Sequence, residues 1–187
     1  MLAGAGAIWF VAVASLAQTA GELKWQVRSP NPSVFSLAGT LGTNGLIYGT
    51  AWPDLIAWDA ASGALLWSTN MDGRPLDYPG SLVVGPEGNV YVNTTEGLEA
   101  FNGTTGAKLW TSRAHGPISI GPDGTLYVTA GNLEAVDPVT GNILWTSFSS
   151  DTSSYAPIVL GANGRGYIGE MSDGSILAVD LRSGGEA

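Results

Sequence analysis

The chain has few side chains with the chemistry for catalysis or for metal binding. Its single histidine, His115, lies in the stretch SRAHGPIS without a Ser, a Cys or an acid in a catalytic pattern, so we interpret it as a solvated loop residue. Asp123, Asp137 and Asp180 lie in turn-forming stretches, where a carboxylate accepts hydrogen bonds from backbone N–H groups. No set of Glu, Asn and Asp has the spacing of a Ca²⁺ loop. We therefore predict no catalytic residue and no metal ligand, and the sequence indicates no cofactor-binding residue.

Composition excludes several further kinds of chemistry. The absence of cysteine excludes disulfides, thiol nucleophiles and thiolate metal sites. A net charge of −9, with only 7 Lys and Arg, argues against nucleic acid as a partner, because phosphate binding needs clustered positive charge. With 187 residues, 44% hydrophobic and 12% charged, the chain is long enough to bury one core. Its 27 glycines and 10 prolines favour short strands and tight turns over helices.

The first twenty residues have the character of an export signal. They contain no charged side chain, and the apolar run at 7–17 has the length of a signal-peptide core rather than a membrane span. Ser15 and Ala17 are small residues suited to cleavage after Ala17. We predict a signal peptide over residues 1–20 and an extracytoplasmic location, either periplasmic, secreted or at the cell surface. The alternatives are an uncleaved membrane anchor, which would be the chain's only link to a membrane, and a misassigned start.

One sequence frame recurs through residues 21–187. It is clearest in LEAVDPVTGNILW, residues 133–145, where an Asp is followed by a Gly four residues later and by a Trp after four more. The frame returns at 55–67, 98–110 and 176–187, and its second half, GELKW, lies at 21–25. We predict structural roles for the residues that define the frame, namely Asp59, Asn102, Asp137, Asp180, Gly63, Gly106, Gly141, Gly184, Trp25, Trp67, Trp110 and Trp145.

A second recurring pattern lies between the copies of this frame. The stretches GTNGLIY, GPEGNVY, GPDGTLY and GANGRGY each place a second Gly three residues, and a Tyr six residues, after the first Gly. Glycine-rich turns between alternating apolar and polar residues are typical of β-hairpins. Each hairpin supplies two predicted strands, and the segments on either side of the Asp–Gly turn supply two more. Every unit therefore contains four predicted strands.

Four antiparallel strands repeated every 35 to 43 residues, about the period of known blades, are typical of a β-propeller. We therefore predict an all-β protein, a β-propeller of about four four-stranded antiparallel blades, with the last blade incomplete at Ala187. One indole in each unit suits packing between neighbouring sheets, so we interpret the four tryptophans as inter-blade core rather than as ligand-binding residues. We favour a partial propeller over a complete four-bladed ring. In a closed ring, the strand of Trp25 would pair with residues 176–180.

The frame Ala-x-Asp-x-x-Thr-Gly-x-x-x-Trp, as at residues 135–145, resembles the repeat of the pyrroloquinoline quinone (PQQ)-type β-propellers. The resemblance covers nearly all of residues 21–187. It implies that the Trp and Gly of successive blades stack on each other, which would be the role of Gly63, Gly106 and Gly141 with Trp67, Trp110 and Trp145. Asn102 replaces the usual Asp and can form the same turn, while Ser62 and Ser183 replace the usual Thr.

The resemblance implies two classes of function. Quinoprotein dehydrogenases of this type hold PQQ and Ca²⁺, use a carboxylate base and often carry a pair of adjacent cysteines. Non-catalytic exported propellers keep the repeat without the cofactor and bind protein segments. Because this chain has no cysteine and no evident Ca²⁺ site, we expect a non-enzymatic scaffold that binds a protein or peptide partner without a cofactor. The alternatives are a fragment of a PQQ-dependent dehydrogenase and the ectodomain of a surface or sensor protein.

Overall fold

The computed structural model describes residues 23–27, 36–76, 81–147, 157–169 and 174–185. The predicted signal peptide lies outside the described residues. Each described strand is short, and the sheets follow one another along the chain. The strands are β1 (Ser36–Leu41), β2 (Leu46–Ala51), β3 (Asp54–Asp59), β4 (Leu65–Asn70), β5 (Leu82–Val84), β6 (Val90–Thr94), β7 (Gly97–Phe101), β8 (Lys108–Ser112), β9 (Ile118–Ile120), β10 (Leu126–Ala130), β11 (Asn132–Val136), β12 (Ile143–Thr146), β13 (Val159–Leu160), β14 (Arg165–Gly169) and β15 (Ile176–Asp180).

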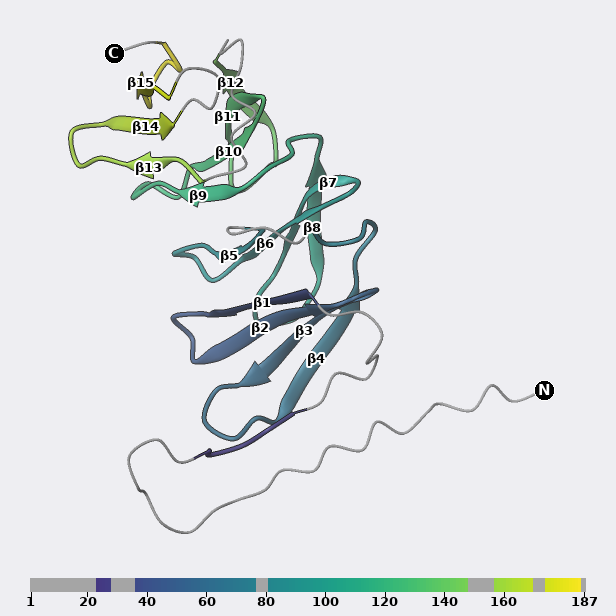
Figure 1. The fold of residues 1–187 in the computed structure, drawn as a ribbon. Coiled ribbons are helices and arrows are strands. Elements are labelled where there is room, and N and C mark those ends of the chain that lie inside the picture. The colour runs from purple at the N-terminus through teal and green to yellow at the C-terminus, as the bar shows by residue number, and fades with distance from the viewer. Residues whose placement is uncertain (1–22, 28–35, 77–80, 148–156, 170–173, 186–187) are drawn as a thin grey trace.

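These strands form four antiparallel sheets, each built from strands consecutive in sequence. We call them blade 1 (β1–β4), blade 2 (β5–β8), blade 3 (β9–β12) and blade 4 (β13–β15). Blades 1 to 3 have four strands each and blade 4 has three described strands. Figure 1 shows the blades stacked in chain order, with residues 23–27 beside blade 1 at one end and β15 at the other. The predicted all-β, partial β-propeller fold is confirmed.

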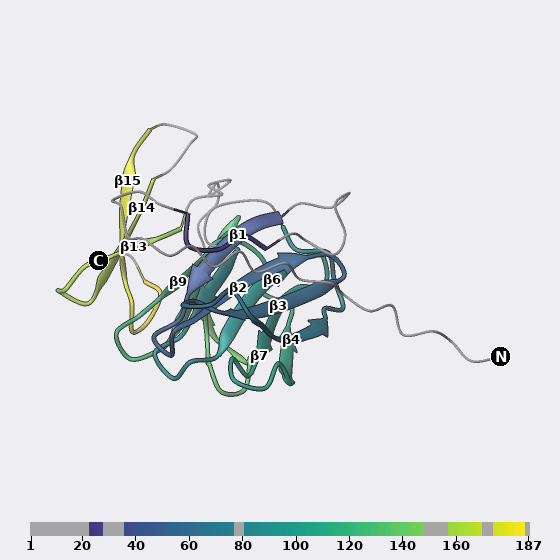
Figure 2. The ribbon, with the colours of Figure 1, turned by 90° about the horizontal axis from the view of Figure 1, so that it is seen from below.

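Successive blades are turned relative to one another. In Figure 2 the strands of blade 1 lie across the view, whereas those of blade 4 run upright. The innermost strands stay close, since β1 contacts β5 and β5 contacts β9. None of the described residues forms a helix of the length and apolarity needed to cross a membrane.

The core lies between the blades, because the apolar side chains on the faces of each sheet pack against those of the neighbouring sheets. One apolar cluster joins blades 1 and 2 around Tyr48 and Phe101, a second joins blades 2 and 3 around Tyr91 and Leu126, and a third joins blades 3 and 4 around Tyr127. The three tyrosines are at most 4% exposed. Burial of this kind contributes about 25 cal/mol per Å² of apolar surface, so the fold is stabilised mainly by contacts between consecutive sheets.

Candidate functional site

The Asp or Asn of each repeat closes the turn that leads into the outermost strand. The backbone N–H of Ser62 donates to Asp59 Oδ1 at 2.7 Å, and that of Thr105 donates to Asn102 Oδ1 at 2.9 Å. Asp137 accepts from Thr140 N and Asp180 from Arg182 N, each at 2.8 Å. Backbone hydrogen bonds, first from Thr140 and also from Val139, hold the pKa of Asp137 below its ordinary value. These side chains are therefore occupied with their own turns.

Each of these turns also packs on the tryptophan of the preceding blade. A Cβ built on Gly106 would lie 2.7 Å from Trp67 Cε3, and one on Gly141 would lie 2.6 Å from Trp110 Cε3. The same approach is found at the other two junctions, Gly63 on Trp25 and Gly184 on Trp145. The structure thus brings together the glycine of one repeat and the tryptophan of the previous one at all four junctions.

Two side chains of one blade donate to a single carbonyl of the next. Trp67 Nε1 and Tyr48 Oη donate to the carbonyl of Gly103 at 3.0 and 3.1 Å. Trp110 Nε1 and Tyr91 Oη donate to the carbonyl of Pro138 at 3.1 and 3.2 Å. The tryptophan and tyrosine of each pair also pack together, with ring centroids 5.8 and 5.7 Å apart. These hydrogen bonds fix the position of each turn on the sheet before it.

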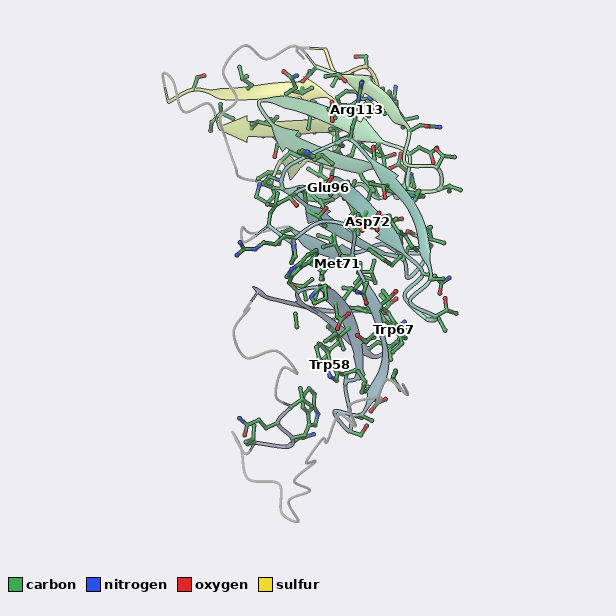
Figure 3. The ribbon with its side chains drawn as sticks, turned by 90° about the vertical axis from the view of Figure 1, so that its right-hand side faces the viewer. Trp58, Trp67, Met71, Asp72, Glu96 and Arg113 are labelled. Atoms are coloured by element: carbon green, nitrogen blue, oxygen red, sulfur yellow. The ribbon has the colours of Figure 1, made fainter. Side chains whose placement is uncertain are left out.

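Sequence reasoning missed a charged cluster between blades 1 and 2. Glu99, on β7, is fully buried and accepts hydrogen bonds from the backbone N–H of Asp72 at 3.1 Å and of Gly73 at 2.9 Å. Lys108 Nζ lies 3.0 Å from Glu99 Oε2 and also pairs with Asp72. Figure 3 places Asp72 and Met71 where the chain leaves blade 1. Glu99 therefore binds the start of the connection between blades 1 and 2, which we call the crossover.

The electrostatics of the cluster favour a permanent ion pair. Burial by itself lowers the pKa of Lys108, but the hydrogen bonds to Asp72 and Glu99 outweigh burial and raise the pKa above its ordinary value. Thr94 Oγ1 lies 2.9 Å from the second Glu99 oxygen and 2.9 Å from the carbonyl of Gly97, which share its one proton. A buried carboxylate that accepts from two backbone N–H groups and from Lys108 is satisfied without a metal ion. One feature of the sequence indicates this cluster. Lys108 lies two residues before the repeat tryptophan, a position that is apolar in the other outer strands, where it is Leu65 and Ile143.

The remaining candidates for chemistry lie apart from one another. His115 is exposed in the loop between β8 and β9, and Asp123 accepts from the backbone N–H of Thr125 at 3.1 Å within its own turn. The described residues contain no group of three His, Asp or Glu placed to hold a metal ion. Because the repeat carboxylates cap their turns and Glu99 is paired with Lys108, the donors among the described residues do not fit the Ca²⁺ site that the resemblance to dehydrogenases implies.

One pocket opens at the end of the stack. It lies between residues 25–27 and the turn at 62–65 and has a volume of about 470 Å³. Its described lining contains no charged side chain. The described lining of the pocket is therefore mostly apolar and offers no side chain that could act as an acid or a base.

The pKa of Tyr91 predicts a loss of stability at alkaline pH. Burial, and then the hydrogen bond to Glu87, raise this pKa well above its ordinary value of about 10. The unfolded chain therefore loses its tyrosine proton first, so the free energy of unfolding should fall as pH rises above about 10. In urea titrations at several alkaline pH values, Tyr91→Phe should make the free energy of unfolding fall less steeply with pH. The reduction should equal the contribution of about one titrating proton. Tyr91→Phe should also cost about 1 kcal/mol at neutral pH, because the hydroxyl proton that Glu87 and the carbonyl of Pro138 share is lost. An unchanged alkaline slope would contradict the assignment.

Antiparallel four-stranded blades joined by Trp–Gly packing define this protein as a PQQ-like β-propeller. The family model described as outer membrane protein assembly factor BamB matches residues 11–120 and 95–187, and the chain belongs to this family. No curated protein sequence matches the chain.

Solved structures show the same fold. BamB from Moraxella catarrhalis is 21% identical with a TM-score of 0.57; the alignment covers 78% of this chain and 50% of BamB. A europium-containing methanol dehydrogenase is 14% identical with a TM-score of 0.59, covering 76% of this chain and 39% of that one. The quinohemoprotein alcohol dehydrogenase from Comamonas testosteroni is 17% identical with a TM-score of 0.59, covering 77% and 33%. The chain thus spans half of BamB and a smaller share of the two dehydrogenases.

Proposed function

We propose that this protein is an exported, non-enzymatic β-propeller that binds protein segments and serves as an assembly scaffold. Membership of a family described as an outer membrane protein assembly factor supports the proposal. The observation that carries it is a repeated apolar surface on the outer strands. The proposal places the protein outside the cytoplasm, after removal of residues 1–20, and assigns it no PQQ and no Ca²⁺.

The outer strands of three consecutive blades expose a leucine at the same repeat position. Leu66, Leu109 and Leu144 each precede the repeat tryptophan and are 51%, 45% and 55% exposed. We call these three residues the leucine row. They lie on β4, β8 and β12, which form the outer edges of their sheets. Scattered exposed leucines are common, but an exposed apolar residue repeated on adjacent edges is typical of an interaction surface.

The exposed leucines and the free strand edges on which they lie indicate what kind of ligand would bind there. A free strand edge offers backbone donors and acceptors, which an extended segment satisfies by adding a strand. Apolar side chains on that segment would cover the leucine of the edge that it joins, and the net charge of −9 favours a segment with basic flanks. The proposed ligand is therefore an extended protein segment with alternating apolar residues and Lys or Arg at its ends.

A labelled peptide tests this proposal. We expect a ten-residue peptide of alternating apolar and polar residues, with Lys at both ends, to bind the purified protein in fluorescence anisotropy. Replacing Leu66, Leu109 and Leu144 together by Ser should weaken binding by about tenfold or more, since tenfold corresponds to 1.4 kcal/mol. The control is Leu41→Ser, which removes a leucine that is 66% exposed on the inner strand β1.

Equal affinity of all three proteins would contradict a role for the leucine row. The alternative function, a fragment of a PQQ-dependent dehydrogenase, is favoured by the similarity to two dehydrogenase structures. Turnover of alcohols by the purified chain, supplied with PQQ, Ca²⁺ and an artificial electron acceptor, would replace the scaffold proposal with this one.

A further inference from the structure

The sequence contains three Asn-Gly bonds, at which an asparagine can lose its side-chain amide without an enzyme. They are Asn44-Gly45, Asn102-Gly103 and Asn163-Gly164. The reaction begins when the backbone nitrogen of the glycine attacks Cγ of the asparagine, and a glycine leaves this approach open because it has no side chain. Exposure alone would favour reaction at Asn44 and Asn163, which are exposed, over the half-buried Asn102. The hydrogen bonds around the three bonds favour the opposite order.

The side-chain carbonyl of Asn102 accepts three hydrogen bonds. Its Oδ1 accepts from the backbone N–H groups of Thr104 at 3.0 Å and Thr105 at 2.9 Å, and from Thr105 Oγ1 at 3.1 Å. Attack on Cγ turns this oxygen into an oxyanion, which donors already directed at it stabilise. Among the described residues, the same oxygens of Asn44 and Asn163 each accept one hydrogen bond, at 3.2 Å. The carbonyl of Asn102 is therefore the most activated of the three.

Repeats with an aspartate in place of Asn102 indicate that this turn favours a negative oxygen. The hydroxyl and then the backbone N–H of Ser62 hold the pKa of Asp59 below its ordinary value. The backbone N–H of Thr140 has the largest effect in lowering the pKa of Asp137. A lowered pKa means that these donors bind the charged oxygen more strongly than the neutral acid. The donors around Asn102 come from the same turn positions, so they favour an oxyanion in the same way.

The amide nitrogen that must leave is held at two of the three bonds. Asn44 Nδ2 donates to Tyr48 Oη at 2.8 Å, and Asn163 Nδ2 donates to Tyr167 Oη at 3.0 Å. Each of these hydrogen bonds has to break before the amide nitrogen departs as ammonia. Within the part of the chain that the structure describes, Asn102 Nδ2 donates to no protein group. Loss of the amide therefore breaks no such hydrogen bond at Asn102.

The backbone nitrogen that attacks is also restrained at the same two bonds. Gly45 N donates to the carbonyl of Gly42 at 3.2 Å, and Gly164 N donates to the carbonyl of Gly161 at 3.3 Å. A nitrogen must lose its proton to attack, so these hydrogen bonds oppose the reaction. Gly103 is buried, yet its N–H donates to no acceptor among the described residues, an uncommon state for a buried backbone donor. Its nitrogen is therefore the most available of the three.

We propose that Asn102 is a modification site at which the folded chain converts its own asparagine into aspartate and isoaspartate. Gly103 N gives its proton to water and forms a bond to Cγ of Asn102. The bond between Cγ and Nδ2 then breaks, and the amide nitrogen takes up a proton and leaves as ammonia. Water opens the resulting cyclic imide in one of two ways. Attack at Cγ gives aspartate, and attack at the backbone carbonyl carbon gives isoaspartate.

The two products differ in their effect on the junction between blades 1 and 2. Asp59, Asp137 and Asp180 occupy this position in the other repeats and accept hydrogen bonds from their own turns, so the aspartate product keeps the turn. Isoaspartate instead adds a methylene group to the main chain before Gly103. The longer chain displaces Gly106, which lies against the Trp67 ring. The isoaspartate product should therefore loosen the contact between the two blades.

Peptide mass spectrometry compares the three bonds within one sample. The full-length protein is incubated in mildly alkaline buffer made with heavy-oxygen water, so that each opened imide carries the label. In the folded protein, Asn102 should react at least about tenfold faster than Asn44 or Asn163, which corresponds to about 1.4 kcal/mol in the barrier. In urea, where the turns are lost, the three rates should become similar. Equal rates in the folded protein, or faster reaction at Asn44 or Asn163, would overturn the proposal.

A matched pair of variants tests the hydrogen bonds to the asparagine carbonyl. Thr105→Val removes one donor to Asn102 Oδ1 and should slow reaction at Asn102 by about threefold or more. Thr140→Val makes the same change in the turn of blade 3 and should leave this rate unchanged. Far-UV circular dichroism checks that both variants fold. An unchanged rate at Asn102 in Thr105→Val, or equal slowing by both variants, would refute activation of the carbonyl by its own turn.

Discussion

Replacing Glu99 by alanine should lower the free energy of unfolding by about 3 kcal/mol, as measured by urea titration. The side chain is fully buried and is the acceptor for the backbone N–H groups of Asp72 and Gly73. Its removal leaves both donors without that partner at the crossover between blades, and each unsatisfied buried group costs about 1–3 kcal/mol. In a protein of this size, we expect the melting temperature to fall by roughly 6–12 °C.

Two further variants separate charge from packing. Glu99→Gln keeps the shape and one acceptor oxygen but removes the charge beside Lys108, so it should lie between wild type and Glu99→Ala. Glu134 occupies the same repeat position on blade 3, where it is only half-buried and faces an outer strand with Ile143 in place of Lys108. Glu134→Ala should therefore cost clearly less than Glu99→Ala. Equal losses at the two positions would show that the crossover contacts of Glu99 contribute nothing particular.

The repeat made the architecture predictable from the sequence. The positions of Asp137 and Gly141 within a recurring frame predicted a turn, and the alternation of apolar residues before each turn predicted strands. Both signals depend only on neighbours in sequence, since an Asx side chain bonds to backbone groups two or three residues away. A period of about 40 residues then specified four short strands for each blade.

The hydrogen bonds between blades were beyond sequence reasoning for a physical reason. The carbonyls that receive the tryptophan N–H groups belong to Ala60, Gly103 and Pro138, which share no side-chain property. A backbone acceptor leaves no trace in residue type, so only the fold reveals the pairing. Glu99 was missed because a Glu between Leu98 and Ala100 has the alternation of an ordinary half-exposed strand. Its burial follows from the crossover at Asp72, which is 27 residues away.

Replacing Gly106 by alanine should lower the free energy of unfolding by about 2–4 kcal/mol. Two penalties combine at this position. The backbone has a φ of 73°, which costs an L-residue about 1–2 kcal/mol, and the new Cβ would lie 2.7 Å from the Trp67 ring, which forces the indole or the turn to move. The ring is also held by its hydrogen bond to Gly103 at 3.0 Å, so it has little freedom to yield.

Gly45→Ala isolates the packing penalty at Gly106 from the backbone penalty. Gly45 has nearly the same φ, 76°, but a Cβ there meets nothing within 4 Å. This variant should therefore lose only about 1–2 kcal/mol. The difference between the two variants measures the contact of the turn with Trp67, and it should shrink when Trp67 is itself replaced by Leu. If Gly45→Ala and Gly106→Ala were equally destabilised in urea titrations, the close approach of glycine to tryptophan would not be what holds consecutive blades together.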